Sequence, residues 1–227
     1  MIFTNLIETN LRTKELGKHI EYYQRIESTN QEAWQIINHE EAQHGTIIIT
    51  DNQLSGKGRN GKTWFMSPSK GLAMSIILKK IISIQDGLLI PIAAGVAAAK
   101  TLENRGGKPK LKWPNDVFLN GKKCGGILCE TTIKNGNITN MVIGLGLNIN
   151  ENLNDFPTSL SNTATSLAIE TNQSNQRELI CAIFTTYLEK FLEDLNPPLQ
   201  YWENYCSHIN DNVSFNQNGV QYSGIFK

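Results

Sequence analysis

The sequence has few cysteines, and none is placed for a metal site or a disulfide framework. The chain of 227 residues contains four, without a Cys-x-x-Cys spacing or a histidine cluster nearby. Zinc sites and disulfide scaffolds both depend on such spacings. We therefore expect no tightly bound protein metal, and free thiols in a reducing compartment at Cys124, Cys129, Cys181 and Cys206.

The sequence also lacks an excess of charge of one sign and a long apolar run. Lysine plus arginine equals aspartate plus glutamate, at 21 each, so net charge does not favour nucleic acid or a membrane surface. The longest apolar stretch, 88–99, contains Pro91 and Gly95 and is too short to span a bilayer. No basic start followed by an apolar core marks a secretory signal. We expect a cytoplasmic protein with no membrane partner.

A cationic, glycine-rich segment stands out against this neutral background. Residues 56–64 read Gly-Lys-Gly-Arg-Asn-Gly-Lys-Thr-Trp and follow an apolar run at 45–50. Glycines can turn successive N–H groups toward one point, which binds anions, and Lys57, Arg59 and Lys62 add positive charge. The segment predicts a phosphate or carboxylate ligand, with a flexible surface loop as the alternative.

The same glycine spacing occurs in dinucleotide-binding and kinase loops, but the context excludes both. A dinucleotide-binding loop must open a helix, and Pro68 and Gly71 would break a helix there. The sequence also contains no His-Arg-Asp or Asp-Phe-Gly, which a kinase requires.

The apolar periodicity predicts both helices and short strands. A helix capped by Ser28 or Thr29 begins near residue 30, and 149–175 is expected to be a long polar loop. Further helices are predicted at 85–104, 176–195 and 199–206, and strands at 46–50, 72–78, 110–113, 117–119, 124–132 and 138–147. We expect one main domain over 1–208, with a β-hairpin in 209–227 that is the start or remnant of a small β module.

Three further segments combine glycines with polar side chains. Lys112-Trp113-Pro114-Asn115-Asp116 would present Lys112 to a phosphate and Asn115 to a ribose or a metal-bound water; alternatively Trp113 anchors the core. Gly125 and Gly126 mark either close approach of a ligand or a bulge. In the third segment, 144–150, Asn148 either faces a metal or triphosphate or caps a turn.

Taken together, these segments resemble the biotin protein ligases in their order and spacing. The resemblance spans residues 28 to about 150 and depends on Ser28-Thr29-Asn30, Gln53, the segment 56–64, Lys112 to Asp116, Lys123 to Leu128 and Gly144 to Asn148. The pairing of Lys-Trp-Pro-Asn-Asp with an upstream glycine-rich cationic loop is specific to that family.

The resemblance implies an α+β fold: a mixed β-sheet with helices on one face, related to class II aminoacyl-tRNA synthetases, and a truncated or short SH3-like β module after it. Some family members carry an N-terminal DNA-binding domain. Too few residues precede Ser28 for such a domain, so we do not expect DNA as a partner. Pairing into a homodimer through a sheet edge is possible.

The resemblance also implies an ATP-dependent ligation of biotin. Biotin and Mg-ATP would form biotinyl-5′-AMP, and the biotinyl group would pass to one lysine of a biotin carboxyl carrier domain of acetyl-CoA carboxylase or a related carboxylase. Two alternatives stay open. They are a lipoate or octanoate ligase or transferase of the same superfamily, and a catalytically idle module that binds biotin or the carrier.

The site residues follow from the resemblance, position by position. Lys112, Arg59 and Asn115 would be catalytic. The biotin site would comprise Ser28, Thr29, Asn30, Gln53, Lys57, Gly58, Arg59, Lys112, Gly125 and Gly126. The nucleotide site would comprise Arg59, Lys62, Trp64, Lys112, Asn115 and Asn148, with Asn148 also facing Mg²⁺.

The glycine-rich loop departs from the family pattern at two positions. Lys57 and Lys62 stand where family members usually have arginine. Lysine lacks the bidentate fork of arginine, so we expect Arg59 to make the bidentate contact and the adenylate to be held more loosely.

Overall fold

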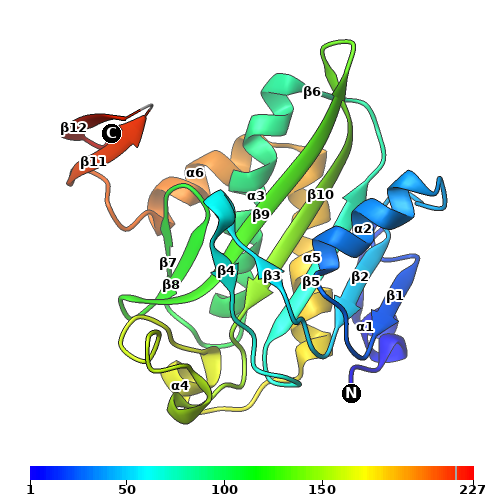
Figure 1. Ribbon diagram of the computed structural model, residues 1–227, viewed down its shortest axis with the longest axis horizontal. Coiled ribbons are helices and arrows are strands. Elements are labelled where there is room, and N and C mark those ends of the chain that lie inside the picture. Colours follow the sequence, from blue (N-terminus) through cyan, green and yellow to red (C-terminus); the bar gives the residue numbers. More distant parts are fainter. Residues whose placement is uncertain (218) are drawn as a thin grey trace.

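A single mixed β-sheet forms the centre of the molecule (Figure 1). The computed structural model describes residues 1–217 and 219–227. The strands follow the order β1 (Ile20–Tyr23), β2 (Ile47–Thr50), β5 (Leu72–Leu78), β10 (Asn137–Leu147), β9 (Lys122–Lys134), β8 (Asp116–Leu119) and β7 (Pro109–Lys112). β1 and β2 are parallel and the other neighbours antiparallel. A short strand, β6 (Ile82–Ser83), also pairs with β10. The predicted mixed sheet is confirmed.

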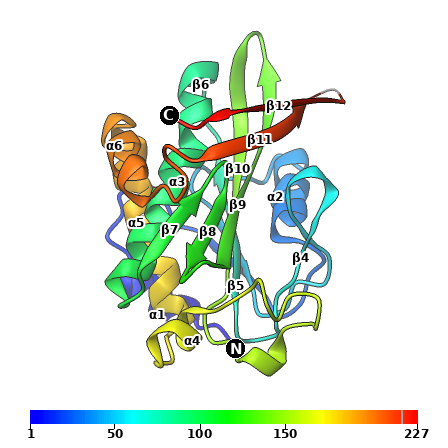
Figure 2. The same ribbon diagram turned by 90° about the vertical axis from the view of Figure 1, so that its left-hand side faces the viewer.

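Most helices cover one face of the sheet, as predicted (Figures 1 and 2). They are α1 (Thr4–Asn10), α3 (Ile84–Asn104), α5 (Arg177–Glu193) and α6 (Asn196–Tyr205). The exception is α2 (Thr29–Asn38), which packs Ala33 against Ile48 and Ile77 on the opposite face. Because alternate strand residues point to opposite faces, Ile47 and Ile49 face the main core while Ile48 faces α2. No described helix combines the length and apolar character that a bilayer crossing needs.

Ser28 caps α2, as the sequence predicts, by accepting a hydrogen bond from Gln31 N at 3.5 Å. The polar segment after β10 contains η2 (Leu153–Asp155) and α4 (Leu167–Thr171). It is fastened by the Lys70–Asp155 ion pair at 2.5 Å and by buried Ser166, which donates to Glu151 O at 2.7 Å. The segment is therefore anchored along its length.

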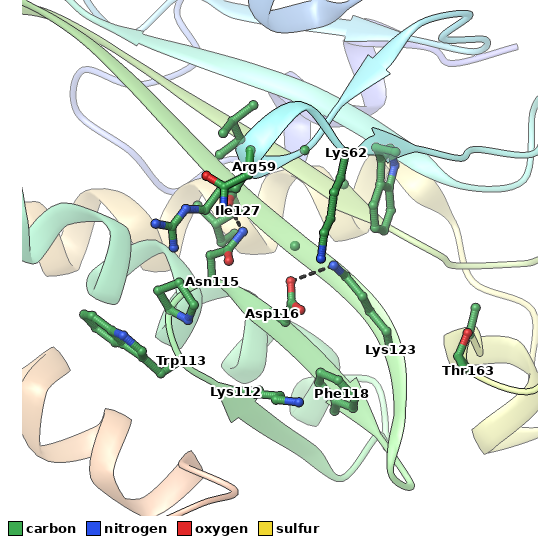
Figure 3. Close-up of a pocket in the computed structure, with 18 of the residues that line it drawn as sticks. Arg59, Lys62, Lys112, Trp113, Asn115, Asp116, Phe118, Lys123, Ile127 and Thr163 are labelled. Carbon is green, nitrogen blue, oxygen red and sulfur yellow. Dashed lines mark hydrogen bonds and ion pairs between the residues drawn. The ribbon is translucent and has the colours of Figure 1, made fainter. Parts of the chain in front are cut away.

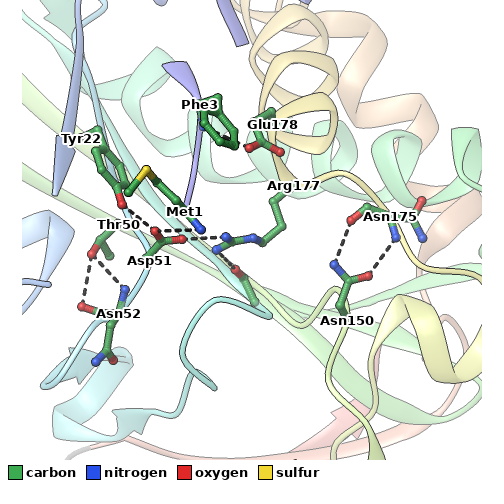
Figure 4. A network of polar contacts seen from close by, with 11 residues as sticks. Met1, Phe3, Tyr22, Thr50, Asp51, Asn52, Asn150, Asn175, Arg177 and Glu178 are labelled. Carbon is green, nitrogen blue, oxygen red and sulfur yellow. Dashed lines mark hydrogen bonds and ion pairs between the residues drawn. The ribbon is translucent and has the colours of Figure 1, made fainter. Parts of the chain in front are cut away.

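A buried ion pair anchors the end of β2, just before Gln53 (Figure 4). Arg177 Nη2 lies 2.6 Å from Asp51 Oδ1, and Tyr22 donates to Asp51 Oδ2 at 2.5 Å. Burial acts to raise the pKa of Asp51, but the hydrogen bonds from Tyr22 and Arg177 outweigh it and lower the pKa. The start of α5 thereby fixes the strand end that leads into the candidate site.

The C-terminal hairpin, β11 (Asn212–Gln217) and β12 (Val220–Ile225), forms a sheet of its own and stands apart from the main sheet in Figure 1. Its base contacts the main body through His208 and Phe226, whose rings lie 4.3 Å apart. Asn218 of the predicted 209–227 segment lies outside the described residues. A small separate β unit agrees with the expected SH3-like module; the boundary at 208/209 stays a prediction.

Candidate functional site

A cavity of about 1270 Å³ lies between the glycine-rich segment and the open face of β9 and β10 (Figure 3). Other parts of its wall come from the start of α2, the turn after β7, the segment 156–164 and the C-terminal hairpin. The structure brings the sequence-predicted site residues together around this cavity: Ser28, Thr29, Asn30, Gln53, Lys57, Gly58, Arg59, Lys62, Trp64, Lys112, Asn115, Gly126 and Asn148.

Gly125 is the exception among the predicted site residues. It is not part of the cavity wall, and a Cβ at this position would lie 2.3 Å from Leu147 Cδ2. The strand requires glycine here because Leu147 packs onto the backbone. The structure gives Gly125 a packing role, whereas Gly126 faces the cavity. Contact between Gly125 and biotin stays a prediction.

The glycine-rich segment is a short hairpin rather than an irregular loop. β3 (Gly56–Lys57) pairs with β4 (Thr63–Trp64) around η1 (Arg59–Gly61), and Gly58 N donates to Lys62 O at 2.7 Å. Asn60 and Gly61 have positive φ angles of 55° and 73°, which glycine and asparagine tolerate best. The hairpin holds Arg59 and Lys62 over the cavity (Figure 3).

A glycine of β10 gives Trp64 its place in the cavity. A Cβ at Gly146 would lie 2.5 Å from Trp64 Cε2, so the indole lies directly against the strand backbone. Any side chain at 146 would push the indole away. The glycine spacing in β10 thus shapes the cavity floor.

The turn from Lys112 to Asp116 is fastened to β9 by the side chain and the backbone of Asn115. Asn115 Nδ2 donates to Ile127 O at 2.8 Å, and Ile127 N donates to Asn115 O at 2.9 Å. Trp113 is 51% exposed and meets Trp202 edge-on with 6.0 Å between ring centroids. It is therefore not the core anchor of the alternative interpretation, and the turn presents Lys112 to the cavity.

Sequence reasoning gave no role to Lys123 and Asp116, although both line the cavity. Lys123 Nζ lies 2.6 Å from Asp116 Oδ1 and 5.8 Å from the Trp64 ring centroid. Figure 3 shows Lys62 extending from the hairpin toward this pair. The turn at Asn120-Gly121 returns Lys123 opposite Phe118 in the β8–β9 register. An Asn-Gly pair between two strand-like runs is typical of a tight hairpin, and this signal could have placed Lys123 near Asp116.

Asn148 and His208 border the cavity at different places. Asn148 is 4% exposed, and its Nδ2 donates to Thr165 O at 2.8 Å, which leaves its Oδ1 for a ligand. His208, which sequence reasoning missed, has a pKa lowered by burial and by the positive charge of Lys112. In the described part of the chain, no three His, Cys, Asp or Glu side chains are grouped to hold a metal ion.

The comparisons with known proteins agree with this geometry. A sequence model described as the biotin/lipoate A/B protein ligase family matches residues 22–148. The chain therefore belongs to this family.

Two relatives illustrate the similarity in sequence. The bifunctional ligase/repressor BirA of Bacillus subtilis is 32% identical over 213 residues, which cover 91% of this chain and 65% of that protein. The biotin–[acetyl-CoA-carboxylase] ligase of Paracoccus denitrificans is 30% identical over 132 residues, 55% of this chain and 52% of that protein. The chain thus spans less than two thirds of either relative.

Solved structures show the same fold. The biotin protein ligase from Aquifex aeolicus in complex with biotin and ATP superposes with a TM-score of 0.73 at 24% identity, over 92% of this chain and 86% of that one. The biotin acetyl coenzyme A carboxylase synthetase from Helicobacter pylori gives a TM-score of 0.64 at 22% identity, over 90% and 88%.

Proposed function

We propose that this protein uses ATP to ligate biotin to a lysine of a biotin carboxyl carrier domain, through biotinyl-5′-AMP. The observation that carries the proposal is one cavity that joins a polar cluster at the start of α2 to cations from three separate segments. Its volume of about 1270 Å³ exceeds the roughly 300–1,000 Å³ of an ordinary small-molecule pocket, as two substrates side by side would need. The relative from Paracoccus denitrificans, which is named a biotin–[acetyl-CoA-carboxylase] ligase, supports the same assignment.

The main chemical obstacle is the repulsion between two anions. In the first step, a biotin carboxylate oxygen would attack the α-phosphorus of Mg-ATP and displace pyrophosphate. Cations and N–H dipoles aimed at both groups lower this barrier most effectively. Arg59, Lys62 and Lys112 surround the volume where the two anions would meet, and Lys112 is the proposed principal catalytic cation, with Lys123 as a second candidate.

The second step transfers the biotinyl group without a covalent enzyme intermediate. The amine of the carrier lysine would attack the acyl carbon of the mixed anhydride, and AMP would leave. Positioning supplies much of the rate, since effective molarity can contribute on the order of 7–11 kcal/mol. Trp64, Asn115 and Asn148 would hold the nucleotide, and Asn148 Oδ1 would face the magnesium that arrives with ATP.

Several finer assignments belong to the same proposal. The carrier domain would come from acetyl-CoA carboxylase or a related carboxylase, and the reaction would take place in the cytoplasm. Residues 1–208 would form the catalytic domain and 209–227 a short SH3-like module. Pairing of two copies through a sheet edge would give a homodimer.

Biotin-dependent exchange of pyrophosphate into ATP tests the function. A biotin ligase exchanges label with biotin and not with lipoate; a lipoate or octanoate enzyme gives the reverse preference or no exchange. An idle binding module gives no exchange with either acid, although it still binds biotin or the carrier. Either of the last two results would refute the proposal.

A further inference from the structure

A chain of hydrogen bonds runs inward from the cavity and fixes the orientation of the Asn30 amide. Asn30 Nδ2 lies 2.7 Å from Glu130 Oε2 and 3.4 Å from Leu128 O. Asn30 Oδ1 lies 2.7 Å from Ser75 Oγ. A backbone carbonyl can only accept, so the nitrogen must face Leu128 and Glu130, and the oxygen must face Ser75. Both polar atoms of Asn30 are thus used within the protein.

The orientation of Asn30 decides where the hydroxyl protons of Ser75 and Thr29 point. Ser75 is fully buried and has one proton, which must go to Asn30 Oδ1 because that atom can only accept. Ser75 Oγ also lies 2.7 Å from Thr29 Oγ1, so Thr29 must donate its own proton to Ser75. The alternative acceptor for this proton, Gln53 Oε1, is farther away at 3.3 Å.

Thr29 therefore offers a ligand lone pairs and no proton. It lines the cavity, where its hydroxyl acts as an acceptor. Its backbone N–H donates to Gln53 Oε1 at 2.9 Å, which turns Gln53 Nε2, a donor, to the other side, against Gly56. Ser28 Oγ accepts from Gln31 N, so its hydroxyl proton is free for the cavity. The site therefore presents one acceptor, the Thr29 hydroxyl oxygen, beside two donor groups, the Ser28 hydroxyl and Gln53 Nε2.

This polarity matches a ligand in which an N–H adjoins a carbonyl. A cyclic urea has both groups side by side, whereas a dithiolane ring offers neither. A site built to hydrogen-bond a particular group discriminates strongly against analogues that lack it, because its own polar atoms are left unpaired. This match rests on the proposed function and identifies the ligand group to which the site would form hydrogen bonds.

We propose that Glu130 and Ser75 are positioning residues that set this polarity and so make the site selective for a cyclic urea N–H. Neither side chain lines the cavity itself. Glu130 lies on β9 beneath the glycine-rich hairpin, where it borders a second cavity of about 620 Å³. Its effect reaches the ligand through Asn30, Ser75 and Thr29.

The test compares biotin with its two cyclic carbamate analogues, in which one or the other ring N–H is replaced by oxygen. Calorimetric titration of the whole protein gives the ratio of affinities for biotin and each carbamate. Wild type is expected to favour biotin over one of the two carbamates by about tenfold or more, the loss of one hydrogen bond plus a lone-pair clash. In Ser75→Ala the Thr29 hydroxyl is free to turn and donate, so this ratio should fall toward one.

Variants of Glu130 test the inner end of this series of hydrogen bonds. Glu130→Met removes the acceptor for Asn30 Nδ2 and should lower the ratio as Ser75→Ala does. Glu130→Gln keeps an acceptor oxygen of the same shape and should preserve it. Thr185→Ala is the matched control, because Thr185 is a fully buried hydroxyl on α5 that donates to Cys181 O at 2.8 Å, away from the cavity wall.

The outcomes separate the inference from the function that it deepens. If Ser75→Ala and Glu130→Met weaken biotin and both carbamates equally, as a purely structural defect would, the inference is overturned while the proposed function stands. If wild type binds none of the three ligands, the proposed function fails and the inference fails with it. A lowered ratio in both variants, with Glu130→Gln and Thr185→Ala unchanged, supports the inference.

Discussion

Gly144 of β10 lies directly beneath the Asn30 carboxamide, so closely that a Cβ at position 144 would come within 2.2 Å of Asn30 Oδ1. Such a distance leaves no room for any side chain, and the neighbouring group is the amide that Ser75 and Glu130 hold in place. Gly144 and Gly146 thus serve one purpose on one strand face, since each admits a cavity residue onto the backbone of β10.

The close contact at Gly144 predicts the effect of a single methyl group. Gly144→Ala should displace Asn30 and weaken biotin binding about tenfold or more, while overpacking should lower the free energy of unfolding by about 1–3 kcal/mol. Titration with biotin and denaturant unfolding measure the two effects. Gly95→Ala is the matched control, because its Cβ would meet only Leu111 methyl carbons at 3.8 and 3.9 Å. Unchanged biotin affinity in Gly144→Ala would contradict the role given to Asn30.

The two lysines of the cavity can be ranked by pyrophosphate exchange. Lys112→Ala should lower biotin-dependent exchange at least a hundredfold, since one lost electrostatic donor costs about 3–4 kcal/mol. Lys123→Ala should lower it less, by about tenfold, because Lys123 shares its charge with Asp116 at 2.6 Å. Lys110→Ala is the control on the same strand as Lys112, as Lys110 does not line the cavity. Near-normal exchange in Lys112→Ala with a severe loss in Lys123→Ala would transfer the principal role to Lys123.

Arg59 is expected to retain the adenylate as well as to assist its formation. Arg59→Ala should release biotinyl-AMP into solution, seen as faster AMP production without the carrier, because the only guanidinium on the glycine-rich hairpin is lost. Arg59→Lys keeps the charge without the fork and should give intermediate leakage. Equal leakage in all three proteins would argue against a bidentate clamp.

Glu151 should make stability depend on pH. Its side chain is fully buried, and neither carboxyl oxygen has a hydrogen-bond partner among the described residues. Burial raises the pKa of Glu151 from 4.5 to about 7. The folded state therefore favours the neutral acid. The contribution of the neutral Glu151 carboxyl to the free energy of unfolding is fully present below pH 4.5 and is lost as the pH rises through about 7.

The shift in the pKa of Glu151 corresponds to a loss of about 3 kcal/mol in the free energy of unfolding by pH 8. Denaturant unfolding at pH 5 and pH 8 measures it. Glu151→Gln has no proton to lose, so the difference in unfolding free energy between the two pH values should shrink by most of that amount, since about 1 kcal/mol is already lost at pH 5. Parallel stability profiles for wild type and Glu151→Gln would show that the carboxyl group finds a partner when it ionises.

The sequence predicts best those features that depend on neighbouring residues. The strand at 72–78 is fully buried, with Ser75 as its single polar residue, and the Asn120-Gly121 and Asn135-Gly136 turns have the positive φ angles that tight hairpins require. The effect of the proline pair at 197–198 was harder to predict. Pro197 and Pro198 lie in the first turn of α6, where proline is tolerated, so α6 begins at Asn196 rather than at the predicted 199.

Contacts between distant parts of the chain could not be predicted in this way. The hydrogen bond from Asn30 to Glu130 joins residues 100 positions apart, and His208 reaches Lys112 only because α6 packs against α3 and β7. No periodicity encodes such pairs. They depend on how the sheet and helices pack, which is also why the sequence could not distinguish Gly125, packed under Leu147, from Gly126, which lines the cavity.

The two walls of the cavity differ in how firmly the molecule holds them. β10 is paired with β9 over most of its length and with β5 from Met141 to Leu147, whereas β3 and β4 share only two residue pairs. Of these two walls the hairpin is therefore the one that can be lifted more easily, since β10 cannot move without breaking its pairing with both neighbouring strands. How long an intermediate stays bound would then be set by the turn at Asn60-Gly61, and could be altered there without disturbing the centre of the fold.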